Sequence, residues 1–249
     1  ANKKYAIPLS ITGASNYSLI PSQRSAILLL NRSILSSVAK VSGGEGIRIK
    51  PVGMHTKAEW TIQMSAIYSS LTRSNLTTAY LSNGTGGGFY TRISSTAGIQ
   101  VKNGRDGDDT WTQIPLQAGK WLHITYVHKD KKTTVYVNGK VQKVFENSAI
   151  TFGENSMIVV GNSGYRNDYL REIRLWDKAL TESEINDYLY LPMDPATPHL
   201  ISYLPLSKEM ETKDLKAPAG TENVTTKARI EYVENVKFPA DELVIVNQE

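Results

Sequence analysis

The chain of 249 residues contains no cysteine. Its fold is therefore held together without disulfide bonds, and any metal site must be built without thiolate ligands. No apolar run reaches the roughly 18 residues of a membrane-spanning helix. The net charge is +4, but 28 basic residues are scattered among 24 acidic ones. No block of five like charges occurs, and this pattern argues against nucleic-acid binding.

The motifs of common enzyme classes are missing too. The sequence has no G-x-S-x-G elbow, no P-loop, no H-E-x-x-H pair and no G-x-G-x-x-G turn between a strand and a helix. The pattern E-x-D-x-x-E, which sets two glycosidase carboxylates on one face of a strand, is also absent. The nearest run, residues 209–214, has no strand pattern and is interpreted as solvated surface. These absences disfavour hydrolase activity.

The histidines show no metal-ligand spacing. His123 and His128 lie in one extended segment, five positions apart. Side chains alternate between the two faces of a strand, so we expect these two imidazoles to point in opposite directions. They then cannot share a metal ion.

Residues 119–177 carry the strongest structural signal. Asn138-Gly139 predicts a two-residue type I′ hairpin, because both residues reach positive φ at low cost. The turn fixes the register, with Val137 opposite Lys140 and Tyr136 opposite Val141. The segment as a whole predicts an antiparallel meander, because its strands follow one another with no helix between them. The five predicted strands are 119–127, 133–137, 140–145, 157–160 and 169–176.

The rest of the chain also favours strands. Residues 32–46 and 69–88 are rich in small or polar residues and are predicted to be a linker or loops. One helix is expected over 179–189, where Thr181 and Glu184 form a capping box. The sequence therefore predicts an all-β fold with one short helix after the strand at 169–176. The other strands are predicted at 47–50, 59–68, 89–93, 98–102, 110–114, 200–206, 228–233 and 243–246.

Two stretches also resemble a known family. They are GKWLHITYVHKDKKTTVYVNGK at 119–140 and IVVGNSGYRNDYLREIRLWDKALTESEI at 158–185. Both are similar to the laminin-G-like domain of the concanavalin-A-like jelly-roll superfamily. The resemblance implies a jelly-roll sandwich of two antiparallel sheets. One departure is that Arg171-Glu172 stand where the family usually has a small glycine.

The resemblance also suggests a domain organisation. Residues 1–35 are similar to the terminal strands of a small β domain that precedes such sandwiches in bacterial outer-membrane glycan-utilisation lipoproteins. Alternatively, they are edge strands of the sandwich itself. Residues 36–249 would form the laminin-G-like sandwich, with a C-terminal extension from about residue 207. The lack of cysteine favours a bacterial source over a secreted eukaryotic one.

An acidic segment is a candidate calcium site. Asp106, Asp108 and Asp109 surround Gly107, and hard cations need several oxygen ligands in a tightly bent loop. Laminin-G-like modules often hold calcium at a loop rim. The resemblance therefore implies that these aspartates could bind calcium. Asp- and Gly-rich turns are also common without metal, so an ordinary turn is the alternative.

Sugar binding requires flat apolar faces beside planar polar groups. Two segments offer both: the residues leading to Trp111, and the loop at 162–169. Trp60, Trp121 and Trp176 are instead predicted to lie in the core. The candidate ligand-binding residues are Trp111, Tyr165, Arg166, Asn167 and Asp168.

These observations favour a non-catalytic, carbohydrate-binding protein at the surface of a Gram-negative cell. The resemblance implies a lipid anchor in the outer membrane, and an accessory role beside a nutrient transporter and its lid lipoprotein. Two alternatives stay open. One is a glycoside hydrolase of the same superfamily; the other is a protein-interaction or scaffold module, including one for peptide uptake.

Overall fold

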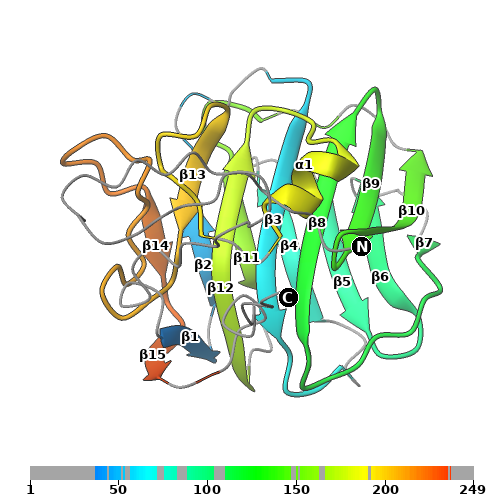
Figure 1. The fold of residues 1–249 in the computed structure, drawn as a ribbon, viewed down its shortest axis with the longest axis horizontal. Helices are drawn as coiled ribbons and strands as arrows, with labels where there is room; N and C mark the ends of the chain where they lie inside the picture. Colours follow the sequence, from blue (N-terminus) through cyan, green and yellow to red (C-terminus); the bar gives the residue numbers. More distant parts are fainter. Residues whose placement is uncertain are drawn as a thin grey trace, which may run out of the picture.

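The computed structural model is built from strands in two facing sheets (Figure 1). It describes residues 37–43, 45–51, 53, 57–71, 76–82, 89–103, 110–146, 150, 152–162, 166–189, 192–234 and 236. No helix in these ranges is long and apolar enough to cross a membrane. Residues 1–35 and the predicted strand 243–246 lie outside them.

The sheet that carries the helix is called here the front sheet. Its strand order is β10-β9-β8-β3-β12-β1-β15, and β13 also pairs with β12. Every pairing in it is antiparallel. Its strands are β1 Ser37–Ser42, β3 Trp60–Ile67, β8 Trp121–Lys129, β9 Lys132–Val137, β10 Lys140–Glu146, β12 Arg166–Trp176, β13 Leu200–Leu204 and β15 Arg229–Glu234.

The opposing sheet is called the back sheet, with the order β14-β2-β11-β4-β5-β6-β7. Its pairings are antiparallel as well, so the predicted jelly-roll sandwich is confirmed. Its strands are β2 Glu45–Ile49, β4 Leu76–Ser82, β5 Phe89–Ser94, β6 Gly98–Asn103, β7 Thr110–Trp111, β11 Met157–Asn162 and β14 Val224–Thr226.

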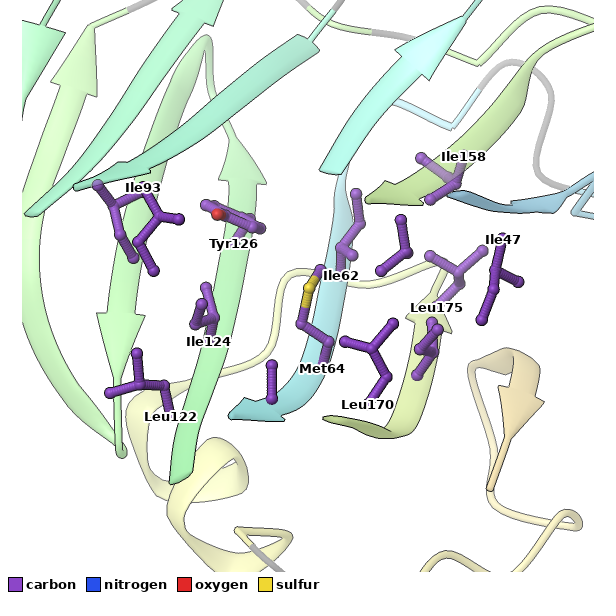
Figure 2. Close-up of a cluster of buried hydrophobic side chains, with 14 of the residues drawn as sticks. Ile47, Ile62, Met64, Ile93, Leu122, Ile124, Tyr126, Ile158, Leu170 and Leu175 are labelled. Atoms are coloured by element: carbon purple, nitrogen blue, oxygen red, sulfur yellow. The ribbon is translucent and has the colours of Figure 1, made fainter. Parts of the chain in front are cut away.

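The main apolar core lies between the two sheets. Figure 2 shows Ile62, Met64 and Ile124 of the front sheet directed toward residues of the back sheet such as Ile93 and Ile158. Trp60 anchors this core with no exposed surface, and its ring stacks on His128 at 5.0 Å between centroids. Its Nε1 donates a hydrogen bond of 2.9 Å to the carbonyl of Ile150. The indole thus buries a large apolar area and still satisfies its polar atom.

The hairpin at Asn138-Gly139 forms as predicted. The two residues have φ of 50° and 75°, and Val137 pairs with Lys140 and Tyr136 with Val141. The helix α1 spans Glu182–Asp187, with Thr181 and Glu184 forming the predicted capping box. Local turn and cap chemistry was therefore a reliable guide.

The meander prediction was wrong beyond β10. β11 crosses to the back sheet, where it pairs with β2 and β4, and only β12 returns to the front sheet. Ile158, Val159 and Val160 are all buried, which is the pattern of a central strand covered on both faces. Such a strand takes its partners from distant segments rather than from its sequence neighbours.

Two predicted loops also contain strands. β1 and the start of β2 lie within the predicted linker 32–46, and β4 lies within the predicted loop 69–88. Each pairs with strands from distant parts of the chain. β7 ends at Trp111, short of the predicted Ile114. Small and polar residues form these strands because strands far away in the sequence supply hydrogen-bond partners for their backbone groups. Local β-propensity does not reflect such long-range pairing.

The segment after residue 207 returns to the first strands. β14 pairs with β2 in the back sheet, and β15 pairs with β1 in the front sheet. Asp214 fastens the connection between β13 and β14. Its carboxylate accepts hydrogen bonds from the hydroxyl of Ser202, the amide of Asn223 and the backbone N–H of Tyr203.

Candidate functional site

Trp111 lies in β7 at the edge of the back sheet, opposite Gln100 of β6. Its side chain is partly buried, so part of the indole faces solvent. Its carbonyl accepts a hydrogen bond of 2.8 Å from Nζ of Lys143 on β10. This bond joins the edges of the two sheets and fixes the backbone of Trp111.

Arg166, Asn167 and Asp168 begin β12, and Arg166 pairs with Ser42 of β1. Asp168 is 2% exposed, and its Oδ1 accepts a hydrogen bond of 2.6 Å from the N–H of Ser69. This carboxylate therefore fastens the chain that leaves β3. The following lie outside the described part: the side chains of Arg166 and Asn167, and all of Tyr165, Asp106, Asp108 and Asp109.

The structure does not bring Trp111 and Asp168 together. Lys143 places Trp111 beside β10, at one edge of the front sheet. β12 lies four strands further along that sheet, in the order β10-β9-β8-β3-β12. At about 4.8 Å per strand this is a separation of roughly 19 Å. Trp111 and Asp168, the two predicted ligand-binding residues whose side chains the structure describes, therefore do not lie in one site.

Among the described residues, no group of three His, Asp or Glu side chains could hold a metal ion. His128 faces the inner core, where its ring stacks on Trp60. His123 lies opposite Ser65, on the other face of the sheet. The two imidazoles point in opposite directions, as the odd spacing predicts.

The outer face of the front sheet carries a buried polar layer that the sequence did not predict. Gln63, His123, Glu172 and Arg174 are each at most 1% exposed. The segment with α1 lies over this face (Figure 1). Ile185 of α1 packs there in a small apolar cluster with Val127, Tyr136, Trp176 and Tyr203.

A β-bulge in β12 creates the layer. Arg171 pairs with Ser65 and Arg174 pairs with Gln63, so β12 has one extra residue between these positions. Glu172 has φ of 58°, in the left-handed region that favours glycine. This is where the family glycine is replaced in the sequence. Because of the extra residue, two arginines three positions apart face the same side of the sheet.

The charges in the layer are paired. Glu172 accepts a hydrogen bond of 2.6 Å from Arg174 and bonds of 3.2 and 3.0 Å from the hydroxyl of Tyr203. Arg174 also donates to the carbonyl of Tyr188, at 2.9 Å. Nε1 of Trp176 donates to Gln63, at 2.8 Å. The bond from Arg174 to Tyr188 attaches the covering segment to the sheet, and the other bonds join β3, β12 and β13 within it.

Burial sets the ionisation of the layer. Burial, with a smaller contribution from the charge of Arg174, lowers the pKa of His123 to about 3. Burial and the neighbouring charge of Glu172 raise the pKa of Tyr203. At neutral pH both side chains are therefore uncharged, and the charges of the layer are carried by its arginines and glutamate.

A cavity of about 220 Å³ lies where α1 meets the segment before β13. Its apolar wall includes Tyr188, whose ring stacks on Trp176 with centroids 5.4 Å apart and planes at 14°. Polar groups line the remainder: Lys178, Glu184, Thr197 and His199.

The charged groups around the cavity are paired with one another. Nζ of Lys178 lies 2.5 Å from Oε1 of Glu184. Partial burial alone would raise the pKa of Glu184, but hydrogen bonds from Lys178 and Thr181 outweigh it and the pKa is lowered. Nδ1 of His199 lies 2.9 Å from Asp177, which also pairs with Lys57 at 3.1 Å.

Similar folds are known from solved structures. A protein from Bacteroides ovatus ATCC 8483, provisionally named a carbohydrate-binding protein, has a TM-score of 0.60 at 19% identity. The match covers 80% of this chain and 60% of that protein, so the chain spans less than two thirds of its length.

Two further structures share the fold. Domain 4 of the extracellular arabinanase AbnA from Geobacillus stearothermophilus, solved with arabinotriose, has a TM-score of 0.51 at 19% identity, covering 61% of this chain and 76% of that domain. A heptameric pentraxin from Limulus polyphemus has a TM-score of 0.53 at 13% identity, covering 81% of this chain and 96% of that one.

None of the curated proteins matches the chain. The model of one protein family does match, over residues 42–186, which include the hairpin at 138–139, the bulge in β12 and the capping box of α1. The chain belongs to the concanavalin A-like lectin/glucanases superfamily.

Proposed function

We propose that the chain is a non-catalytic carbohydrate-binding module. The observation that carries the proposal is the lectin-like sandwich itself. The Bacteroides ovatus protein with this fold is provisionally named for carbohydrate binding, and the arabinanase domain was solved with arabinotriose. At 19% identity these neighbours share a fold rather than a ligand. They favour oligosaccharides as the class to test first.

The hydrogen bonding of the buried carboxylates supports a binding function without catalysis. Among the described residues, the buried acids are Asp168, Glu172 and Asp214. Each accepts hydrogen bonds from the protein itself, from Ser69, Arg174 and Ser202 respectively. Glycosidases instead need two carboxylates flanking one scissile bond, about 5 to 9.5 Å apart. Carboxylates fixed by internal donors are suited to holding the fold together.

The proposed setting is the surface of a Gram-negative cell. In this proposal a lipid anchor holds the protein in the outer membrane, beside a nutrient transporter and its lid lipoprotein. The proposal rests on the resemblance of residues 1–35 to the domain that precedes such sandwiches, and on the provisionally named Bacteroides neighbour. Co-purification from outer membranes would support it, and recovery of the protein from another compartment would contradict it.

Trp111 is the proposed stacking residue of the binding surface. It lies on a strand whose backbone is fixed by Lys143, and part of its indole is exposed. A rigid, partly exposed ring loses little conformational entropy when a sugar stacks on it. Calcium at Asp106, Asp108 and Asp109 stays a prediction.

Retention on a panel of immobilised glycans tests the function. We expect the wild-type chain to be retained and Trp111→Ala to bind at least about tenfold more weakly, a loss of about 1.4 kcal/mol. Trp121→Ala is the matched control, because Trp121 is also partly buried but lies in β8. Released reducing ends would indicate a hydrolase, and no retention of the wild-type chain would contradict carbohydrate binding.

A further inference from the structure

We infer that the cavity beside α1 binds one neutral monosaccharide residue, separately from the surface around Trp111. This inference rests on the proposed carbohydrate-binding function. It adds a second site, which is defined by Tyr188, Lys178, Glu184, Thr197 and His199.

The size of the cavity fits a single sugar ring. Its volume of about 220 Å³ is below that of pockets for drug-sized ligands, which are about 300 to 1,000 Å³. The cavity therefore accommodates one ring with its hydroxyls, and further sugar units would extend into solvent. Affinity at this site should thus depend little on the length of the oligosaccharide.

The lining has the two components that sugars require. The partly buried ring of Tyr188, held parallel to Trp176, forms an apolar wall. The C–H groups of a sugar ring pack against such a wall, while its hydroxyls need nearby polar partners. Lys178 and Glu184 supply a donor and an acceptor on the same rim.

The pairing of charges favours a neutral ligand. An anion would compete with Glu184 for Lys178, and a cation would compete with Lys178 for Glu184. A hydroxyl group can instead donate to the carboxylate and accept from the ammonium while the ion pair stays intact. The ammonium has three N–H donors and the carboxylate about four lone-pair positions, so both retain capacity after pairing.

His199 adds a polar group with a fixed direction. Its Nδ1 is paired with Asp177, which orients the ring. Its Nε2 makes no hydrogen bond to any described residue, and the side chain is 57% exposed. The ring therefore presents a nitrogen that can bond a sugar hydroxyl at the mouth of the cavity.

Filling the cavity tests the inference. Thr197→Phe places an aromatic ring at the mouth, and Thr225→Phe adds the same bulk on the exposed face of β14. Binding of arabinose, glucose, galactose and xylose, and of their di- and trisaccharides, is measured by ligand-observed NMR and calorimetry. Melting temperatures confirm that each variant is folded.

We expect the wild-type chain and Thr225→Phe to bind at least one monosaccharide, with affinity within about threefold of that for its trisaccharide, a difference below 1 kcal/mol. Thr197→Phe should lose this binding, and Lys178→Met should weaken it.

Two results would overturn the inference and can be told apart. If a folded Thr197→Phe variant keeps full affinity for every sugar that the wild type binds, the cavity is not a sugar site, although carbohydrate binding stands. If the wild-type chain binds none of these sugars and none of the glycan panel, both the cavity site and the proposed function are wrong.

Discussion

On its inner face, β3 places Trp60 and Ile62 against the back sheet, whereas on its outer face it places Thr61 and Gln63 beneath the segment that carries α1. All four side chains have no exposed surface. The inner face is apolar and filled by packing. The outer face is polar, and its groups are joined by hydrogen bonds such as that from Trp176 to Gln63.

The difference shows that alternation in a strand does not by itself mean exposure. Polar residues at every second position usually indicate a solvated face. Here the polar face is covered, and burial of its charges is tolerated because Arg174 and Tyr203 both donate to Glu172. A substitution on the inner face should therefore destabilise the fold according to the side-chain volume that it removes. A substitution on the outer face should destabilise the fold when it leaves a buried polar group without its hydrogen-bond partner.

The largest effect is expected on the inner face. Trp60→Ala removes the ring that contacts His128 and Phe89 and leaves the carbonyl of Ile150 without its donor. We expect a loss of about 3 to 5 kcal/mol in the free energy of unfolding. Urea unfolding followed by circular dichroism measures it. A loss below 1 kcal/mol would show that the core repacks around the gap.

A slightly smaller effect is expected for one broken pair on the outer face. Arg174→Met leaves Glu172 buried without its closest cation, and we expect a loss of about 3 kcal/mol. The double variant with Glu172→Gln should recover part of it, because both charges of this pair are then gone, while the buried Arg171, 3.9 Å from Glu172, loses an acidic neighbour. Additive losses in this double-mutant cycle would show that the pair is not the source of the effect.

The features that could be predicted from the sequence belong mainly to the inner face and to local turns and caps. The alternation at Trp60 to Ile67, the Asn138-Gly139 turn and the Thr181 cap gave the inner core strands, one hairpin and the helix. These signals are local or periodic. The partners of β1, β4 and β11 were not predictable, because the choice between sheets depends on strands far away in the chain.

The candidate site was less predictable than the fold. Trp111 was expected at a rim and lies on an edge strand, but nothing in its neighbourhood indicated that β12 would be four strands away from β10. The cavity residues Lys178, Glu184 and His199 meet only because β13 returns to pair with β12. Arg171-Glu172 in place of glycine was the one local signal of the outer-face bulge.

The two buried histidines should make folding sensitive to acid. Because the folded pKa of His123, about 3, lies below its ordinary value of 6.5, the unfolded chain binds a proton first as pH falls. The contribution of His123 to the free energy of unfolding therefore decreases by roughly 1 kcal/mol per pH unit as the pH falls from 6.5 toward 3.

His123→Gln removes this contribution on the outer face and leaves that of His128 on the inner face, whose pKa is also lowered by burial. Unfolding by urea at pH 7, 6, 5 and 4 should therefore show a shallower loss of stability for the variant than for the wild type. Equal slopes would mean that folding does not change the protonation of His123.

The smallest effect is expected at the cover of the outer face. Thr181→Ala removes the side chain that caps α1, and we expect a loss of about 1 kcal/mol. Thr181→Ser should keep the cap. Hydrogen exchange of the Ile185 amide should accelerate while that of the Ile62 amide does not, because α1 is a short element whose cap lies at the surface. If both amides exchange faster by the same factor, the cover opens only when the whole sandwich unfolds, and the polar layer is then as much a part of the core as the apolar one.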